Sequence, residues 1–199
     1  MEENLKTPAF GVLAGGRSSR MGQDKAALIL NGKTFLQRVL EAGETFPERL
    51  VSLAAAQTAP ELPPDVTAVR DEREASGPME GIRQILRACK APACLMAAAD
   101  MPFLTGELLR ALAAQYPGSG NLVLTLGGRP EPLCSIYCRE CVPVIEQLQR
   151  QGLSRPALLF DRVPTKRISL EELGFSPTVV ENINEPAQYR ALIGGSHGA

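Results

Sequence analysis

Short apolar runs alternate with longer helical patterns along most of the chain, and this alternation limits its fold more than any other feature. The run from Pro8 to Ala14 predicts a buried strand, and the spacing of apolar residues from Thr34 to Glu44 predicts a helix. Further strands are predicted at 50–55, 66–69 and 93–99, and further helices at 79–90 and from Thr105 onward. Such alternation implies parallel strands joined by right-handed crossovers, so we expect a doubly wound, mostly parallel α/β sheet.

The later part of the chain is less regular. Apolar runs at 122–126 and 133–137 flank Gly127-Gly128-Arg129-Pro130, which predicts a hairpin and therefore one antiparallel strand. Helices at 140–151, 156–160 and 186–193 and a strand at 166–168 are also expected. With 199 residues, no internal repeat and no linker, residues 1–199 are expected to form a single domain.

Composition excludes several classes of protein. The net charge of −1 gives no general attraction to nucleic acid or anionic lipid, and no apolar run approaches the roughly 20 residues that span a bilayer. The first residues are acidic where a signal peptide would be basic. The five cysteines, Cys134, Cys138 and Cys141 among them, fit reduced thiols better than a metal site. We therefore expect a cytoplasmic protein without nucleic-acid or membrane partners.

Polar residues follow three of the predicted strands. The first group is the glycine-rich, basic segment from Leu13 to Lys25, and the others are Asp71 and Asp100. Ligands of open α/β sheets bind beyond the carboxyl ends of the strands. Glycines allow backbone N–H groups to point at one anion, and Mg²⁺ takes one or two carboxylates plus phosphate oxygens. The pattern predicts a metal–phosphate site with Asp100, and Asp71 as a second candidate, on the metal.

Two better-known phosphate loops are excluded by spacing. Gly16 is followed by five residues before Gly22, and Lys25 lacks an adjacent Ser or Thr, so the segment is not a Walker loop. The dinucleotide fingerprint Gly-x-Gly-x-x-Gly is also absent from it.

The segment from Leu13 to Lys25, Leu-Ala-Gly-Gly-x-Ser-x-Arg-Met-Gly-x-Asp-Lys, resembles the signature loop of nucleotidyltransferases. More closely, it resembles that of the molybdenum cofactor guanylyltransferases. The similarity continues in the expected order over nearly the whole chain, through Asp71 and the segments 77–82, 99–103, 131–133 and 182–186.

The resemblance implies a fold of the nucleotide-diphospho-sugar transferase type and transfer of GMP from GTP to molybdenum-loaded molybdopterin, with release of pyrophosphate. It also implies Mg²⁺, and partner proteins of molybdenum insertion and molybdoenzyme maturation. Lys25 and Asp100 would be catalytic, and Asp100 would hold the metal. The resemblance also implies residues that bind the nucleotide and the acceptor: Leu13, Ala14, Gly15, Gly16, Arg20, Lys25, Asp71, Gly77, Gly81, Asp100, Asn182 and Asn184. The acceptor pterin would lie near Asn182 and Asn184.

The chain departs from the family pattern at three places. The segment 53–56 lacks the asparagine that often contacts the base or ribose. Glu80 stands where a small residue is usual, and its carboxylate either receives the N–H groups of guanine or faces solvent. Glu185 replaces the usual threonine after Asn184.

Three alternative functions stay open from the sequence. A cytidylyltransferase acting on the same pterin is the nearest, although Gly16 and the Asp-Met-Pro-Phe segment that starts at Asp100 favour guanine. The others are a sugar-nucleotide pyrophosphorylase and a non-catalytic nucleotide-binding or carrier protein of the same fold. The single histidine, His197, lies outside every motif, so we expect catalysis by positioning and charge neutralisation.

Overall fold

The structure is a computed structural model, and it describes residues 7–15, 25–72 and 77–195. Seven strands among these residues form one sheet in the order β5-β4-β1-β6-β8-β7-β9. Their bounds are β1 Ala9–Leu13, β4 Arg49–Leu53, β5 Val66–Arg70, β6 Ala93–Ala98, β7 Asn121–Leu126, β8 Arg129–Cys138 and β9 Thr165–Ser169. Strand β8 is antiparallel to both neighbours, and the other pairs in this sheet are parallel. The expected mostly parallel sheet with one antiparallel strand is confirmed.

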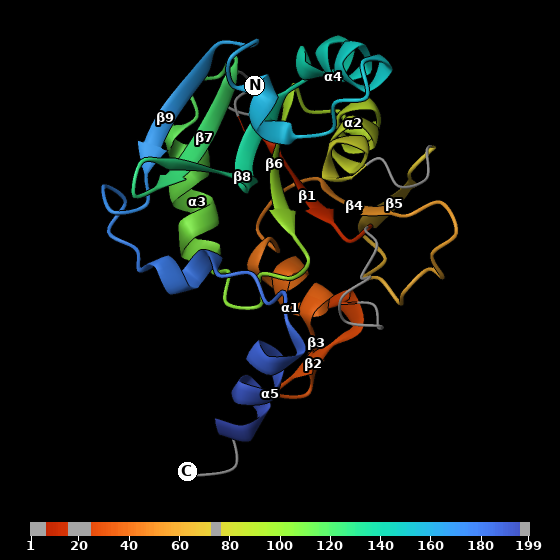
Figure 1. The fold of residues 1–199 in the computed structure, drawn as a ribbon, viewed down its shortest axis with the longest axis vertical. Coiled ribbons are helices and arrows are strands. Elements are labelled where there is room, and N and C mark those ends of the chain that lie inside the picture. The colour runs from red at the N-terminus through yellow and green to blue at the C-terminus, as the bar shows by residue number, and fades with distance from the viewer. Residues whose placement is uncertain (1–6, 16–24, 73–76, 196–199) are drawn as a thin grey trace.

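Helices cover both faces of the sheet (Figure 1). Helix α2 (Pro78–Ala88) packs against α4 (Cys141–Arg150), and α1 (Phe35–Ala42) packs against α3 (Gly106–Gln115). Consecutive residues of β1 identify the two faces, because side chains alternate along a strand. Phe10 lies against Gly43 at the end of α1, whereas Gly11 lies against Ile85 of α2.

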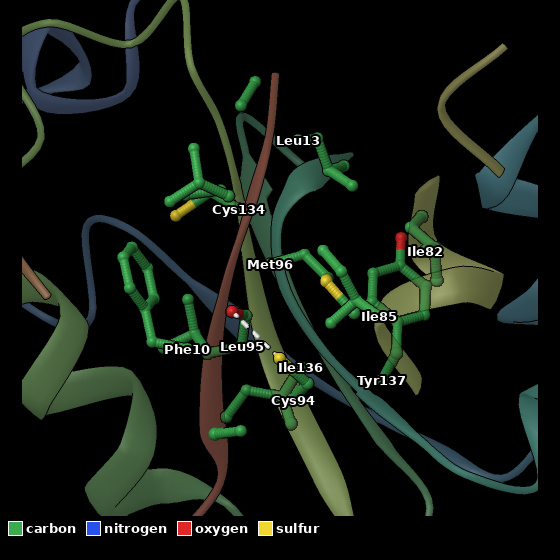
Figure 2. Close-up of a cluster of buried hydrophobic side chains, with 14 of the residues drawn as sticks. Phe10, Leu13, Ile82, Ile85, Cys94, Leu95, Met96, Cys134, Ile136 and Tyr137 are labelled. Atoms are coloured by element: carbon green, nitrogen blue, oxygen red, sulfur yellow. Dashed lines mark hydrogen bonds between the residues drawn. The ribbon is translucent and has the colours of Figure 1, made fainter. Parts of the chain in front are cut away.

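The core lies along the central strands β1 and β6, in which every residue is buried. Figure 2 shows Phe10 on one side of β1 and Ile82 and Ile85 of α2 on the other. A Cβ atom on Gly11 would come within 2.9 Å of Ile85 Cγ2, so this glycine lets α2 lie directly over β1. Strands buried on both faces are typical of parallel sheets, as the apolar runs predict.

Several predicted element boundaries agree with the structure to within a few residues. Thr105 caps α3, its side chain accepting a hydrogen bond from Leu108 N, as a helix N-cap does. The short helix expected at 156–160 is the 3₁₀ helix η3 (Pro156–Leu159). A further 3₁₀ helix, η4 (Pro177–Val180), was not predicted. Among the described residues, no helix combines the length and the apolar character needed to cross a membrane.

A small hairpin that the sequence analysis missed packs with the last helix. Strands β2 (Ile29–Leu30) and β3 (Lys33–Thr34) flank Asn31 and Gly32, whose φ angles of 51° and 79° suit a type I′ turn. Asn-Gly is a strong hairpin signal, and here it was present in the sequence after Ile29 and Leu30. Figure 1 shows the hairpin beside α5 (Pro186–Gly195), at one end of the molecule.

Phe35 is the centre of the contact between this hairpin and α5. Its side chain is 0% exposed and lies in a second hydrophobic cluster with Leu28, Leu30 and Ile183. Its ring makes an edge contact with Tyr189 of α5, at 5.9 Å between centroids. The Tyr189 hydroxyl donates to the carbonyl oxygen of Ile29 at 2.8 Å, so α5 is fixed to the hairpin by both apolar and polar contacts.

We expect Phe35→Ala to lower the free energy of unfolding by about 3–5 kcal/mol, because it leaves a cavity in a small cluster. Urea denaturation followed by circular dichroism measures the loss. Ile29→Ala, at a side chain in the same hairpin that is 55% exposed, is the control and should change stability by less than about 1 kcal/mol. Equal effects of the two substitutions would contradict the role of Phe35.

Candidate active site

The carboxyl ends of four parallel strands meet at one edge of the sheet. Just past β1, Ala14 N donates to Ser52 O of β4 at 3.0 Å. Just past β6, Ala99 N donates to Leu13 O at 3.1 Å. The strand ends are therefore held at the same level by main-chain hydrogen bonds. The predicted binding residues Leu13 and Ala14 lie on this edge, as expected from the sheet topology.

Three predicted site residues that are distant in sequence meet at this edge. Lys25, in the 3₁₀ helix η2 (Lys25–Ala27), places its Nζ 3.1 Å from Asp100 Oδ2 and 2.6 Å from Asn184 Oδ1. The neighbouring Ile183 N donates to Asp100 O at 2.9 Å. Because the Ile183 side chain is also buried in the second cluster, the segment that carries Asn184 is anchored at Ile183 by both main chain and side chain.

The donor atoms at Asp100 fit a magnesium-like ion. The Asp100 side chain is 19% exposed, and the amide oxygen of Asn184 lies on the same lysine. Within the described residues no group of three or more His, Cys, Asp or Glu side chains is arranged to hold a metal. A single, partly exposed carboxylate suits an ion that takes its other ligands from water and phosphate.

The alternative that Asp71 shares this metal stays a prediction. Asp71 follows β5 and Asp100 follows β6, and the strands β4 and β1 lie between them. Their main chains start about three strand spacings apart, but the Asp71 side chain reaches across β4 to within 3.2 Å of the Cβ position of Gly15, at the end of β1.

The Asp71 side chain lies close to Gly15, which follows β1. Its main-chain N donates to Leu53 O at 2.9 Å, which continues the pairing of β5 with β4. A Cβ atom on Gly15 would lie 2.8 Å from Ala54 N and 3.2 Å from Asp71 Oδ2. Glycine is thus required at this position by the close approach of the two strand ends.

The Asp71 carboxylate lacks the partners that a buried charge needs. Among the residues that the structure describes, no donor reaches its buried Oδ1 atom. Burial and, to a smaller extent, the negative charge of Glu80 raise the pKa of Asp71 to about 6, against the opposing effect of the positive charge of Arg83. An unpartnered carboxylate oxygen at the sheet edge can accept a hydrogen bond from a ligand.

Gln57 provides an amide near the position of the missing asparagine. Its Oε1 accepts from Ala54 N at 3.0 Å, and its Nε2 donates to Ala14 O at 3.2 Å. The side chain therefore links the ends of β4 and β1. The sequence analysis missed this residue, although it is the first polar side chain after three consecutive alanines.

The two predicted glycines around α2 have structural reasons for being glycine. Gly77 precedes the helix with a φ of 68°, in the left-handed region that favours glycine. A Cβ atom on Gly81 would lie 2.5 Å from Ser52 Oγ and 3.0 Å from Leu13 Cδ2. Gly81 thus allows α2 to pack on the ends of β1 and β4. Nucleotide contacts by these two glycines stay predictions.

Glu80 does not face solvent, so that alternative is wrong. Its side chain is 0% exposed and accepts hydrogen bonds from Arg83, Gln84 and Gln149. Burial acts to raise the pKa of this carboxyl, but these hydrogen bonds and the charge of Arg83 outweigh it and lower the pKa to about 2. The carboxylate is occupied by protein donors and stays ionised at neutral pH.

The remaining predicted residues divide into two groups. Asn182 lies just before the anchored Ile183, and its buried Oδ1 has no hydrogen-bond partner among the described residues. Glu185 contributes its main-chain N–H, which donates to Gln188 Oε1 at the start of α5. Gly16 and Arg20 lie outside the described residues. The five cysteines are buried free thiols, as the composition predicts.

Comparison with known proteins identifies the family. A family model described as MobA-like NTP transferase domain matches residues 11–163 of this chain. The chain belongs to the MobA-like NTP transferases. The match includes the end of β1, Asp71 and Asp100, and it ends before the segment of Asn182 and Asn184.

Similar proteins extend the match over nearly the whole chain. A curated relative from Carboxydothermus hydrogenoformans, named probable molybdenum cofactor guanylyltransferase, is 30% identical over 95% of this chain and 96% of its own length. The crystal structure of a molybdopterin-guanine dinucleotide biosynthesis protein A from Archaeoglobus fulgidus superposes with a TM-score of 0.76, at 23% identity, covering 96% of this chain and 100% of that one. A Mycobacterium tuberculosis protein crystallised in complex with manganese has the same fold, with a TM-score of 0.66 and 17% identity over 94% of this chain and 98% of that one.

The raised pKa of Asp71 leads to a direct prediction. The ¹³Cγ resonance of Asp71 should titrate with a midpoint near pH 6, about two units above an ordinary aspartate, because its charged form is desolvated and faces Glu80. Side-chain NMR measures the midpoint, and Asp71→Asn assigns the signal. Since protonation relieves an unfavourable buried charge, this group favours the folded state most below pH 4, and that contribution is lost as pH rises through 6. A midpoint near 4 would contradict the burial of this carboxylate.

Proposed function

We propose that this chain transfers GMP from GTP to molybdenum-loaded molybdopterin, forming molybdopterin guanine dinucleotide and pyrophosphate. The observation that carries the proposal is the meeting of Lys25, Asp100 and Asn184 at the carboxyl edge of the sheet. The name of the curated relative, probable molybdenum cofactor guanylyltransferase, supports the choice of substrates. We further propose that residues 1–199 act as one domain, since α5 returns to pack against Phe35 near Lys25.

The reaction needs positioning more than it needs a base. An oxygen of the terminal phosphate of the acceptor, already anionic, forms a bond to the α-phosphorus of GTP. The bond from that phosphorus to the bridging oxygen breaks, and pyrophosphate leaves with the electron pair. No proton must be removed from the nucleophile, so the chain contributes by aligning the two substrates and neutralising their charge.

Lys25 and Asp100 would divide the charge neutralisation between them. Mg²⁺, for which the Asp100 carboxylate and the Asn184 amide oxygen are suitable donors, would offset the charge of the triphosphate. The manganese complex of the similar Mycobacterium tuberculosis protein supports a divalent ion in this fold. The Lys25 ammonium, held by Asp100 and Asn184, would bind the phosphates of the leaving group. Its position between the end of β6 and the segment before α5 supports this role, because there it would offset the negative charge that develops on the leaving group.

The segment around Ile183 would receive the acceptor. Its main chain is bound to Asp100 O. It is flanked by the amide of Asn184 and by the Oδ1 of Asn182, which has no partner within the part of the chain that the structure describes. Acceptor oxygens held beside a nucleotide site can bind the ring N–H groups of a pterin. Asp71 and the main chain of Gly15, on the other side of β1, would contact the nucleoside.

The same proposal implies partner proteins and a cellular compartment. A protein that makes this dinucleotide would pass it to molybdoenzyme-maturation proteins and receive its acceptor from molybdenum-insertion proteins. Five buried free thiols are compatible with a reducing cytoplasm, which is where we place the reaction.

The experiment that tests the function is pyrophosphate release by the purified protein with molybdenum-loaded molybdopterin and Mg²⁺, comparing GTP, CTP and ATP. Release with GTP alone is the expected result. Release with CTP alone would contradict the guanine specificity and indicate a cytidylyltransferase on the same pterin. Binding of a nucleotide without release of pyrophosphate would contradict the enzyme and favour a non-catalytic nucleotide-binding protein.

Substitution of the two charged residues tests their roles separately. Lys25→Ala should lower kcat/KM for GTP about 100-fold, because a charge that stabilises the leaving group is lost. Asp100→Asn should abolish turnover and also weaken Mn²⁺ binding, measured by electron paramagnetic resonance without acceptor. Lys33→Ala, which removes an exposed lysine paired with Glu41, is the matched control and should leave both quantities unchanged. Unaltered Mn²⁺ binding in Asp100→Asn would contradict the assignment of this carboxylate to the metal.

A further inference from the structure

Glu80 is a fully buried carboxylate in the first turn of α2, and four side-chain hydrogen bonds surround it. Oε1 accepts from Arg83 Nη2 at 2.7 Å and from Gln84 Nε2 at 2.8 Å. Oε2 accepts from Arg83 Nε at 3.1 Å and from Gln149 Nε2 at 2.8 Å. Gln149 belongs to α4, so the carboxylate joins the two helices on this face of the sheet.

A fifth hydrogen bond connects Glu80 to the edge of the sheet. Glu72 N donates to Glu80 Oε1 at 3.2 Å. Glu72 directly follows Asp71, whose own N–H is held by Leu53 O. Asp71 is therefore fixed by hydrogen bonds on both sides, one to the main chain of β4 and one to a side chain inside α2.

The ion pairs of Glu72, which also hold this segment after β5, are weaker. The Glu72 carboxylate accepts from Arg83 Nη2 at 2.7 Å and from Arg87 Nη1 at 3.3 Å, but its side chain is 58% exposed. Exposed ion pairs contribute little because water and salt screen them. The hydrogen bond from Glu72 N, by contrast, ends on a carboxylate that is 0% exposed.

Net stability does not explain a buried ion pair of this kind. Replacement of a buried pair by apolar side chains of similar volume is often neutral or stabilising, because the desolvation of both charges offsets their attraction. What the pair supplies is a fixed arrangement of several donors around one carboxylate. Here one of those donors is the main chain that follows Asp71.

We propose that Glu80 is a positioning residue of the nucleotide site: from inside the protein it fixes the segment after β5 and, with it, the carboxylate of Asp71. The proposal rests on the proposed function for the statement that Asp71 contacts the nucleoside. Glu80 does not touch the nucleotide, because its oxygens are occupied by protein donors and its side chain is buried.

Glu80 also affects the pKa of Asp71, and therefore its charge. Glu80 and Arg83, both from α2, are the charged groups that influence its pKa, and they act in opposite directions. Gly15 and Ala54 approach it from β1 and β4 with main-chain atoms. A change at Glu80 should therefore alter both the place and the charge of the Asp71 carboxylate.

Two variants separate position from stability. Glu80→Gln keeps an acceptor oxygen for Glu72 N and removes the charge. The double variant Glu80→Met with Arg83→Met replaces the buried pair by apolar side chains, which preserves the fold, and removes that acceptor. Glu146→Gln is the control, because it removes another carboxylate 3.5 Å from Arg83 and leaves the Glu80–Glu72 hydrogen bond intact.

The measurement is the dissociation constant of GTP by calorimetry, without acceptor, with urea unfolding of each variant alongside. We expect the double variant to bind GTP about 10-fold more weakly, and Glu80→Gln and Glu146→Gln to bind within about 3-fold of the wild type. In Glu80→Gln the NMR midpoint of Asp71 should also fall below 6. GTP affinity equal to wild type in a folded double variant would overturn the proposal.

The same experiment distinguishes this proposal from the function on which it rests. If the wild type binds GTP but releases no pyrophosphate, the guanylyltransferase proposal fails and the role of Glu80 is still decided by the variants. If the wild type binds CTP in place of GTP, the same variants are compared with CTP. A wild type that binds neither nucleotide would overturn both proposals.

Discussion

The parallel pairing of β1 with β4 on one side and with β6 on the other is the constraint on which the rest of the structure depends. Its register places Leu13 opposite Ser52 and Ala98, so the loops after these strands leave the sheet at one level. Parallel strands leave their polar connections at the same edge, and the central strands can then be apolar throughout. The candidate site is a consequence of that register.

The charged side chains near this edge differ in burial and in hydrogen bonding. Lys25 and Asp100 remain partly exposed and pair with one another, which leaves them able to exchange partners with a ligand. Glu80 is buried but surrounded by donors, so it stays ionised and rigid. Asp71 is half-buried, its buried Oδ1 has no donor among the described residues, and its raised pKa reflects that cost. A ligand that donates to this oxygen would recover part of the cost.

Much of the fold could be predicted because its signals are local. The apolar run at 93–99 is the six-residue buried strand β6, and Thr105 begins α3 as its side chain predicts. The hairpin at Asn31 and Gly32 was missed despite a clear local signal, because two-residue strands are too short to show alternation. Gln57 and the Glu80 cluster could not be predicted, since their partners come from other elements of the chain.

The sequence by itself determined the strand and helix order, the glycine-rich segment after β1, and the residue types that can bind a triphosphate and a metal. These depend on local periodicity, turn chemistry and the identity of side chains. Only the tertiary structure decided which of them meet. It brought Asn184 to Lys25 across 159 residues, separated Asp71 from Asp100 by two strands, and placed Glu80 inside the protein. The physical reason is that burial and pairing of charge depend on packing between distant segments, which no local pattern encodes.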